Sequence, residues 1–470
     1  LMDDTGILKG KTTSLPIAGL SWNDLNGYFQ MNQITDINLG NLTPSNGTAV
    51  EGVLRFMDSF QDETAPLPYQ SQGDGLWTET SSWRYGNVRN IPNGFGIDGT
   101  TAIDWNIVTI NHNIEVLDRD INLSSLIVEN NTLSIANSDP DDGQYIRIRH
   151  YLKLESTTAQ LRLVGESQLL QDENSSVDYT GLGQLERHQQ GTANLFNYNY
   201  WSSPVSSNGI DFQIGTVLYD QGQNVQWTNS FDSDASTTPI TLSRRWLYLY
   251  ENYPEDDYAS WSPIDENTFV GVGLGYLAKG SGTAETLQNY GFKGKPNNGD
   301  IQLPITSGNQ ALVGNPYPSA IDAHQFIDDN IGSIDGALYF WVHYDTNNTH
   351  LLKDYQGGYS TYTKAGGNPA VSPPEISQDG SSSKIPERYI PVAQGFFVGS
   401  SSSGGDVTFN NGQRVFNIEG ATGVADDGSV FMRNLTASNP AAQRHNPIQR
   451  MRVNCYGADG AKRPLLWAFS

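Results

Sequence analysis

The chain has 470 residues, and its 51 acidic and 27 basic side chains give a formal net charge of −24 at pH 7. This balance argues against a nucleic-acid partner, because binding to phosphate groups depends on basic patches. No run reaches the roughly 18 apolar residues that a membrane-spanning helix needs, and the single cysteine, Cys455, has no partner for an internal disulfide.

The composition indicates an all-β fold. Aromatic residues make up 11% of the chain and charged residues only 17%, while 48 glycines and 22 prolines divide it into short segments. Within these segments apolar and polar residues alternate, which is typical of β-strands joined by many turns. We expect a β-solenoid-like section followed by an antiparallel β-sandwich-like domain, with one short helix.

Residues 1–80 are predicted to form an irregular or β-rich N-terminal segment and a linker. Turn-forming residues interrupt every apolar run, and residues 62–75 have the composition of a linker. The alternative is a set of strands that partner chains complete.

Residues 81–196 are predicted to form the solenoid-like domain, because short apolar pairs recur there. The second pairs begin at residues 114, 133 and 152, a step of 19 residues, and the first pairs end at 110, 128 and 148. Strands that recur every roughly 20 residues without helices between them suit a solenoid, in which each rung covers the next. A meander of evenly spaced hairpins gives a similar spacing and is the alternative.

One segment of this domain, residues 145–155, carries a cationic stripe. With a period of two, its odd-numbered positions share the face opposite the apolar residues. Because solenoid lyases use Arg or Lys beside acidic sugars, the stripe is a candidate saccharide-binding site. Its residues are Arg147, Arg149, Tyr151 and Lys153. The competing interpretation is a solvated strand face, and His150 is interpreted as a hydrogen-bonded core residue.

Residues 197–420 are predicted to form the sandwich-like domain, whose strand-like runs are longer and rich in aromatic residues. In residues 244–250, one face carries Trp246, Tyr248 and Tyr250. In residues 336–344, Tyr339 and Trp341 alternate with apolar side chains. We expect most of these rings to form core, and an exposed aromatic platform that binds sugars is the functional alternative.

Two glycine-containing runs of this domain carry more specific expectations. In the strand predicted over residues 269–277, glycines at every second position leave one face bare. We expect aromatic rings to pack over this face, and the close approach of another sheet or a ligand is the alternative. Gly395 is expected to form a bulge that directs Phe396 and Phe397 into the core.

A single helix is predicted over Ser319–Asn330, directly after Pro318, because Ile321, Phe326 and Ile327 can share one face. Residues 421–470 are expected to begin a further β domain with strand-like runs at 450–456 and 463–469. Because that pattern stops in the middle, we expect the chain to continue beyond Ser470.

Motifs for catalysis and cofactor binding are missing from the sequence. There is no nucleophile elbow, zinc-protease motif, phosphate-binding loop or dinucleotide fingerprint, and the seven histidines do not fall at metal-ligand spacing. Acidic turns at residues 138–143, 255–257, 328–330 and 426–428 offer oxygen ligands of the kind that Ca²⁺ prefers, although none completes an EF-hand. We predict no cofactor and no catalytic residue, with Ca²⁺ at one or two of these turns as the alternative.

Several strings, taken in order, resemble those of secreted and cell-surface proteins of Bacteroidota that the type IX secretion system exports. As a set they are specific, although each alone is weak. They are LVGESQLLQ (163–171), HQQGTANLFNYNYWSSPV (188–205), GVGLGYLAKG (271–280), FKGKPNNGD (292–300), LVGNPYPSAID (312–322), GALYFWVHYD (336–345), IPVAQGFFV (390–398) and VTFNNGQRVFN (407–417).

This resemblance implies a long modular β-rich protein at the cell surface, exported across both membranes. Its partners would be the secretion machinery, through a C-terminal sorting domain beyond this chain, and other cell-surface proteins or copies of itself. It implies no catalytic residue.

Three hypotheses for function follow. The first is a non-enzymatic structural or adhesive protein of the cell surface. The second is a carbohydrate-binding or polysaccharide-degrading protein with a site on the solenoid face. The third is a filament subunit whose first 80 residues complete the sheet of a neighbour.

Overall fold

The structure is a computed structural model, and it describes residues 38–39, 52–53, 68–84, 86, 91–95, 102–139, 142–254, 257–344, 347, 349–377, 379–420, 428–433, 449–456 and 462–469. Strands dominate this part of the chain, and its α-helices, α3 (Ile214–Val217) and α4 (Ala323–Asp329), are short. The predicted all-β class is therefore confirmed.

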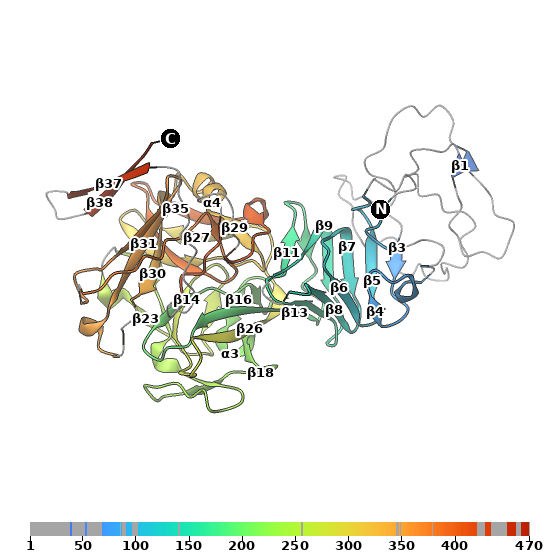
Figure 1. The fold of residues 1–470 in the computed structure, drawn as a ribbon, viewed down its shortest axis with the longest axis horizontal. Helices are drawn as coiled ribbons and strands as arrows, with labels where there is room; N and C mark the ends of the chain where they lie inside the picture. Colours follow the sequence, from blue (N-terminus) through green and yellow to red (C-terminus); the bar gives the residue numbers. More distant parts are fainter. Residues whose placement is uncertain are drawn as a thin grey trace.

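Strands from the first part of the chain form two parallel sheets, and the strands from β3 to β11 alternate between them (Figure 1). We call this region the parallel stack. One sheet contains β3 (Pro68–Gln70), β5 (Ile107–Ile110), β7 (Ile121–Val128), β9 (Tyr145–Leu154), β11 (Gln168–Gln171) and β12 (Ser176–Val177). The other contains β4 (Gly75–Leu76), β6 (Ile114–Leu117), β8 (Thr132–Ala136), β10 (Gln160–Leu163) and β13 (Gln184–Thr192). This parallel pairing differs from a meander, in which neighbouring strands run antiparallel.

The register of the parallel stack explains where the 19-residue step applies and where it fails. Leu133 of β8 pairs with Ile114 of β6, as the step predicts. Leu152, however, pairs with Leu126 in the opposite sheet, and Leu161 takes the place beside Leu133. The reason is that residues 145–154 form one ten-residue strand instead of two short ones.

Two of the short N-terminal strands lie within the segment that has a linker-like composition. β3 pairs with β5 and β4 pairs with β6, so residues 68–76 extend the parallel stack. Most of the first 67 residues lie outside the described part of the chain, which includes only β1 (Asn38–Leu39) and β2 (Gly52–Val53) of them.

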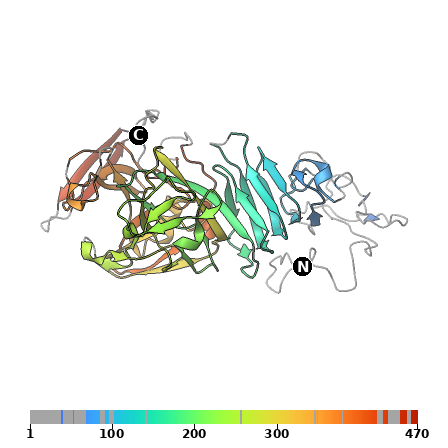
Figure 2. The same cartoon turned by 90° about the horizontal axis from the view of Figure 1, so that it is seen from below.

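One sheet of the parallel stack continues into the second region of the molecule (Figures 1 and 2). β13 pairs antiparallel with β26 (Leu287–Pro296) over eight residue pairs. β26 in turn pairs with β17 (Leu218–Asp220) and β15 (Val205–Ser206), and β18 (Gln223–Asn224) forms the edge. Backbone hydrogen bonds therefore join the two regions across a continuous sheet.

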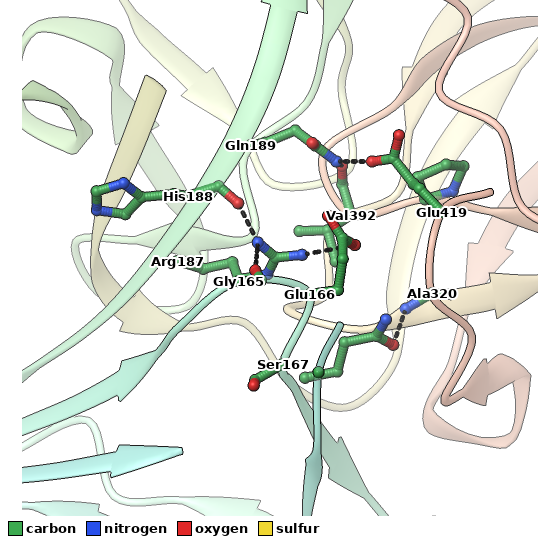
Figure 3. Close-up of polar contacts among 12 residues, drawn as sticks. Gly165, Glu166, Ser167, Arg187, His188, Gln189, Ala320, Val392 and Glu419 are labelled. Carbon is green, nitrogen blue, oxygen red and sulfur yellow. Dashed lines mark hydrogen bonds and ion pairs between the residues drawn. The ribbon is translucent and has the colours of Figure 1, made fainter. Parts of the chain in front are cut away.

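Buried polar side chains close the same junction (Figure 3). Arg187 of β13 is 1% exposed, donates to the carbonyls of Gly165 and His188, and pairs with Glu166 at 3.2 Å. The neighbouring Gln189 donates to Glu419 at 2.8 Å and to the carbonyl of Val392. Because a buried charge is stable only when it is paired and hydrogen-bonded, these contacts hold the last turns of the parallel stack against the second region.

The second region contains two antiparallel sheets that face each other across aromatic side chains. A four-stranded sheet has the order β14 (Tyr198–Trp201), β25 (Tyr276–Lys279), β21 (Tyr248–Leu249) and β23 (Ser262–Pro263). A six-stranded sheet has the order β22 (Tyr253–Pro254), β28 (Asn309–Gly314), β34 (Gly395–Ser400), β30 (Ile334–His343), β31 (Gly357–Thr363) and β32 (Gly366–Val371). We call this region the aromatic region.

Short strands and single helical turns complete the described part of the chain. The strands are β16 (Asp211–Gln213), β19 (Gln226–Thr228), β20 (Thr241–Ser243), β24 (Phe269–Gly271), β27 (Ile301–Ile305), β29 (Ala320–Asp322), β33 (Tyr389–Ile390), β35 (Gly405–Phe409), β36 (Arg414–Val415), β37 (Gln449–Tyr456) and β38 (Lys462–Phe469). The 3₁₀ turns are η2 (Thr80–Ser82), η3 (Arg244–Trp246), η4 (Tyr258–Ser260), η5 (Leu352–Asp354) and η6 (Asn411–Gln413). β37 and β38 pair as a hairpin, which confirms the strands expected near the end of the chain.

The predicted helix exists but is shorter than expected. It begins at Ala323, where the side chain of Asp322 accepts the backbone N–H of His324 as an N-cap. Residues 320–322 form β29 instead, because Ile321 pairs with both β33 and β36.

The glycine-containing runs also differ from their predictions. The strand expected over residues 269–277 divides into β24 and β25, because Gly273 adopts a φ of +92°, which favours glycine. A Cβ at Gly273 would meet Ile301, Leu303 and the ring of Phe409, and one at Gly275 would meet Leu312. An aromatic ring therefore packs over Gly273, as expected, together with aliphatic groups.

No bulge forms at Gly395, because β34 pairs with β28 in continuous register. Phe396 and Phe397 therefore point to opposite faces of the strand, and they belong to different core clusters. A Cβ at Gly395 would approach the backbone of Tyr200 to 2.9 Å, so glycine permits close packing between the two sheets of the aromatic region.

None of the helices within the described ranges is long and apolar enough to cross a membrane.

Candidate functional site

The aromatic region encloses a cavity of about 310 Å³ between its two sheets. Twelve of the twenty residues that line it are aromatic, which is an unusual concentration of rings. They are Tyr198, Tyr200, Trp246, Tyr248, Tyr250, Tyr258, Trp261, Tyr339, Trp341, Tyr355, Tyr359 and Phe397. We call this space the aromatic cavity.

Strand alternation places the rings of the six-stranded sheet. On β30, Leu338 and Phe340 pack into an apolar core on one face, while Tyr339 and Trp341 line the cavity on the other. The same rule applies to β34, where Phe397 lines the cavity and Phe396 lies in the opposite core. The alternation predicted for residues 336–344 is confirmed.

The opposite wall comes from the four-stranded sheet and the turns beside it. Trp246, Tyr248 and Tyr250 all line the cavity, so they share one side as their spacing predicted, although Trp246 belongs to the 3₁₀ turn η3. Tyr198 and Tyr200, two residues apart on β14, extend this wall.

Contacts between rings hold the walls in place. The rings of Tyr200 and Trp341 stack across the two sheets, with centroids 6.3 Å apart and planes 10° from parallel. Trp261 packs edge-on against Tyr250 at 5.1 Å and against Phe397 at 5.7 Å. Such ring pairs stabilise a structure beyond the area they bury, so this wall is preorganised.

A few polar groups reach the cavity among the rings. Asp257, Gln310, His350 and Glu375 line it, and the hydroxyls of Tyr200 and Tyr359 lie 3.2 Å apart. Burial raises the pKa of the Tyr200 hydroxyl well above its ordinary value, so the group stays protonated near neutral pH. The aromatic cavity thus combines flat apolar faces with neutral and acidic hydrogen-bonding groups.

The indole nitrogen of Trp341, in contrast, is fully buried. The side chain is 7% exposed, and its N–H finds no hydrogen-bond partner within the described ranges. A buried donor without a partner is costly, but solvent does not reach this atom, so it is not among the groups that a ligand in the cavity contacts.

Lys279, at the end of β25, lies directly behind the aromatic wall and is 3% exposed. Its ammonium lies 3.6 Å from the centre of the Trp246 ring and 4.7 Å from that of Tyr198. It donates to the hydroxyl of Tyr355 and contacts Nδ1 of His350 at 2.9 Å. Burial lowers the pKa of Lys279 to about 7, while the charge of Asp232 acts in the opposite direction.

His350 connects this lysine to the surface. Its Nε2 contacts a carboxylate oxygen of Asp232 at 2.8 Å, and its ring stacks on Trp246 with centroids 4.7 Å apart. The order Asp232, His350, Lys279, Tyr355 therefore forms a chain of hydrogen bonds that ends at the cavity wall.

The predicted cationic stripe lies elsewhere, on the outer face of β9 in the parallel stack, and each of its members has an acidic partner. The contacts are Arg147 to Asp172 at 2.8 Å, Arg149 to Asp104 at 3.3 Å, Lys153 to Glu155 at 3.2 Å, and the Tyr151 hydroxyl to Asp178 at 2.7 Å. His150, interpreted from the sequence as a core residue, is half-buried. A role for the stripe in saccharide binding stays a prediction.

Of the four acidic turns considered for Ca²⁺, only residues 328–330 lie wholly inside the described ranges. There Asp328 pairs with Lys364, and Asp329 accepts hydrogen bonds from the Gln325, Asn410 and Gln413 side chains. Three or more His, Cys, Asp or Glu side chains do not gather as a metal-binding group anywhere in the described ranges.

Several residues of the cavity wall, and the lysine behind it, were missed by reasoning from the sequence. Lys279 ends an otherwise apolar strand, and Tyr355 and His350 lie in a loop without a motif. Residues 366–383 are rich in Gly, Pro and Ser, which is typical of a loop, yet they contain β32 and supply Ile376 to the cavity. The one usable signal was a period-two alternation along β31, whose residues alternate between buried and half-buried from Gly358 to Thr363.

A model of the family described as Domain of unknown function (DUF8693) matches residues 69–469. Neither a curated protein nor a solved structure matches the chain.

Proposed function

We propose that the chain, which belongs to this family of unknown function, is a binding protein. Its aromatic cavity holds a neutral saccharide. The observation that carries the proposal is the cavity of about 310 Å³ with twelve aromatic rings in its walls. Its size falls in the range of small-molecule sites, which are mostly apolar and carry a few placed polar groups.

The chemistry of the walls favours a sugar ring. The C–H faces of a pyranose stack on flat aromatic surfaces, and its hydroxyls need donors and acceptors at the edges. Tyrosine and tryptophan supply both, because each has an apolar body and a polar group. Gln310 and Glu375 would bind the hydroxyls.

The charges at the cavity favour a neutral saccharide over an acidic one. The lining includes Asp257 and Glu375, and no Lys or Arg side chain is part of it within the described ranges. Lys279 lies behind the wall, where Trp246 and Tyr355 separate it from the cavity. A uronate in the cavity would meet carboxylates without a facing cation.

Binding without turnover is the activity that we propose. A glycosidase needs two carboxyl groups on either side of the bond that it breaks. Asp257 already accepts hydrogen bonds from the backbone N–H of Ala259 and the hydroxyl of Ser260, as the cap of η4.

The cellular role that we propose is adhesion at a bacterial cell surface after export by type IX secretion. Its support is the set of resembling strings between residues 163 and 417, together with the acidity of the chain. In this proposal the aromatic cavity is the binding region that the surface protein presents.

Isothermal titration with neutral hexasaccharides of glucose, xylose and mannose tests the proposal, with polygalacturonate as the acidic comparison. We expect at least one neutral hexasaccharide to bind and Trp261→Ala to weaken it at least tenfold. Trp227→Ala is the matched control, because Trp227 is also a half-buried tryptophan but lies on β19, outside the cavity. Binding that survives Trp261→Ala unchanged, or turnover lost on Glu375→Gln, would contradict the proposal.

A further inference from the structure

We propose that Lys279 is a positioning residue of the cavity wall and that its contact with His350 makes this wall sensitive to acid. The inference deepens the proposed function and rests on it where saccharide binding is concerned. The arrangement of the wall itself is a separate property that can be measured without a ligand.

The contacts of Lys279 show how one side chain can hold the wall. Its ammonium lies against the faces of Trp246, Tyr198 and Tyr355, at 3.6, 4.7 and 5.0 Å from the ring centres. These rings come from η3, β14 and the residue after η5, so Lys279 joins three segments that are distant in the sequence. When the amine is protonated these are cation–π contacts, which strengthen when they are desolvated. When it is neutral, its hydrogen bonds to Tyr355 and His350 remain.

The charge of Lys279 is balanced only through its neighbours. Within the described ranges, no carboxylate forms an ion pair with its ammonium, and the nearest acidic group in the network is Asp232, beyond His350. Removing His350 as an acceptor therefore leaves the ammonium with the Tyr355 hydroxyl and the ring faces alone.

The proton positions on His350 follow from its two partners. Nε2 contacts a carboxylate, which can only accept, so Nε2 carries the proton and donates to Asp232. Nδ1 then has a lone pair and accepts from Lys279. When acid protonates the second nitrogen, an N–H points at the ammonium, and the hydrogen bond changes into repulsion between two like charges.

Other groups near the pair keep their protonation state across the relevant pH range. Burial, followed by the charge of Lys279, lowers the pKa of His343 to about 3, so that imidazole stays neutral. Burial raises the pKa of Tyr198 and Tyr355 above the ordinary value, so both hydroxyls stay protonated. The guanidinium of Arg245 lies over the Phe231 ring, next to His350.

Lys384 is a control for Lys279. It shows whether an effect comes from the contacts of Lys279 with the wall or from any enclosed lysine. Lys384 donates to the carbonyls of Phe431 and Arg433, and burial lowers its pKa to about 7, as for Lys279. It does not line the aromatic cavity and lies against no aromatic ring of its wall.

Near-UV circular dichroism between pH 5 and 9 tests the proposal on the ligand-free chain, because this signal reports fixed aromatic packing. We expect the wild type to show a transition in this range and Lys384→Met to keep it. Lys279→Met and His350→Asn should each reduce its amplitude at least threefold. The asparagine places an amide oxygen close to the position of Nδ1, so it accepts from Lys279 at every pH.

Titration with cellohexaose at pH 8 and pH 5.5 gives the second measurement. The wild type should bind at least fivefold more weakly at pH 5.5, and His350→Asn should bind equally at both values. Failure of cellohexaose to bind at any pH would contradict the proposed function for this ligand, while the dichroism still decides the role of Lys279.

A wild type without the transition, or variants at Lys279 and His350 that keep its full amplitude, would overturn the inference. If Lys279→Met does not fold, the dichroism of His350→Asn alone decides whether the inference holds.

Discussion

The parallel stack and the aromatic region share a continuous sheet, yet they fill their interiors in different ways. Between its sheets, the stack buries aliphatic side chains such as Val108, Leu126 and Leu161, each 0% exposed. The aromatic region places rings between its sheets and leaves a cavity of about 310 Å³. One interior is filled by its own side chains, and the other has room for a ligand.

The difference explains how the aromatic region can have rigid walls and still leave a cavity. Branched aliphatic side chains interdigitate until few voids remain, which suits a stack whose rungs repeat. Rings pack edge-on or offset, and the pairs around Trp261, at 5.1 to 5.7 Å, fix their positions without filling the space beside them. A rigid wall and an open space can therefore coexist in the aromatic region.

The largest effect that would sharpen this comparison is expected in the interior of the stack. Leu161→Ala on β10 removes a fully buried side chain between Leu133 and Leu185, and we expect it to lower the free energy of unfolding by about 2–5 kcal/mol. Denaturant unfolding measures this change. Leu182→Ala, at a residue that is 64% exposed, is the control and should stay within about 0.5 kcal/mol. If Leu161→Ala weakened saccharide binding as well as stability, the assignment of binding to the aromatic region would be contradicted.

A smaller effect is expected in the pH dependence of stability. The pKa of Lys279 is about 7 in the folded chain and that of an unfolded lysine is about 10.4. Between these values the unfolded chain binds more protons, so stability rises with pH in this window, and below pH 7 the full cost of the buried charge is present. From pH 7 to 9, Lys279→Met should remove a rise on the order of 2 kcal/mol. Equal slopes in denaturant unfolding of the two proteins would show that Lys279 is not buried as a charge.

The smallest effect concerns the rim of the aromatic cavity. Tyr258, in η4, lines the cavity and is 62% exposed, so we expect Tyr258→Ala to weaken saccharide binding about threefold with little change in stability. Phe269→Ala is the matched control, because Phe269 is 66% exposed but lies on β24, outside the cavity. Titration calorimetry of the two variants separates a rim contact from a general loss of exposed aromatic surface.

Much of the fold could be predicted because it depends on local spacing. Alternation with a period of two identified the faces of Tyr339 and Trp341 and of Trp246 and Tyr248. It could not show that these faces meet, since the two sheets come together through pairs distant in the sequence, such as Tyr200 with Trp341.

Other features had no local signal at all. The charge of Lys279 gave no indication that it would be buried, because its partners His350 and Tyr355 lie more than 70 residues away. The division of the glycine-containing run at Gly273 depends on a backbone angle that glycine permits but does not require.

The central claim, that the aromatic cavity binds a neutral saccharide, is tested most directly by a crystal structure of the chain with the hexasaccharide that binds it most tightly. The account predicts a pyranose ring stacked on the cavity wall beside Trp261, with hydroxyls hydrogen-bonded to Gln310 or Glu375. A saccharide bound on the outer face of β9 at Arg147 and Lys153, with the aromatic cavity empty, would contradict it.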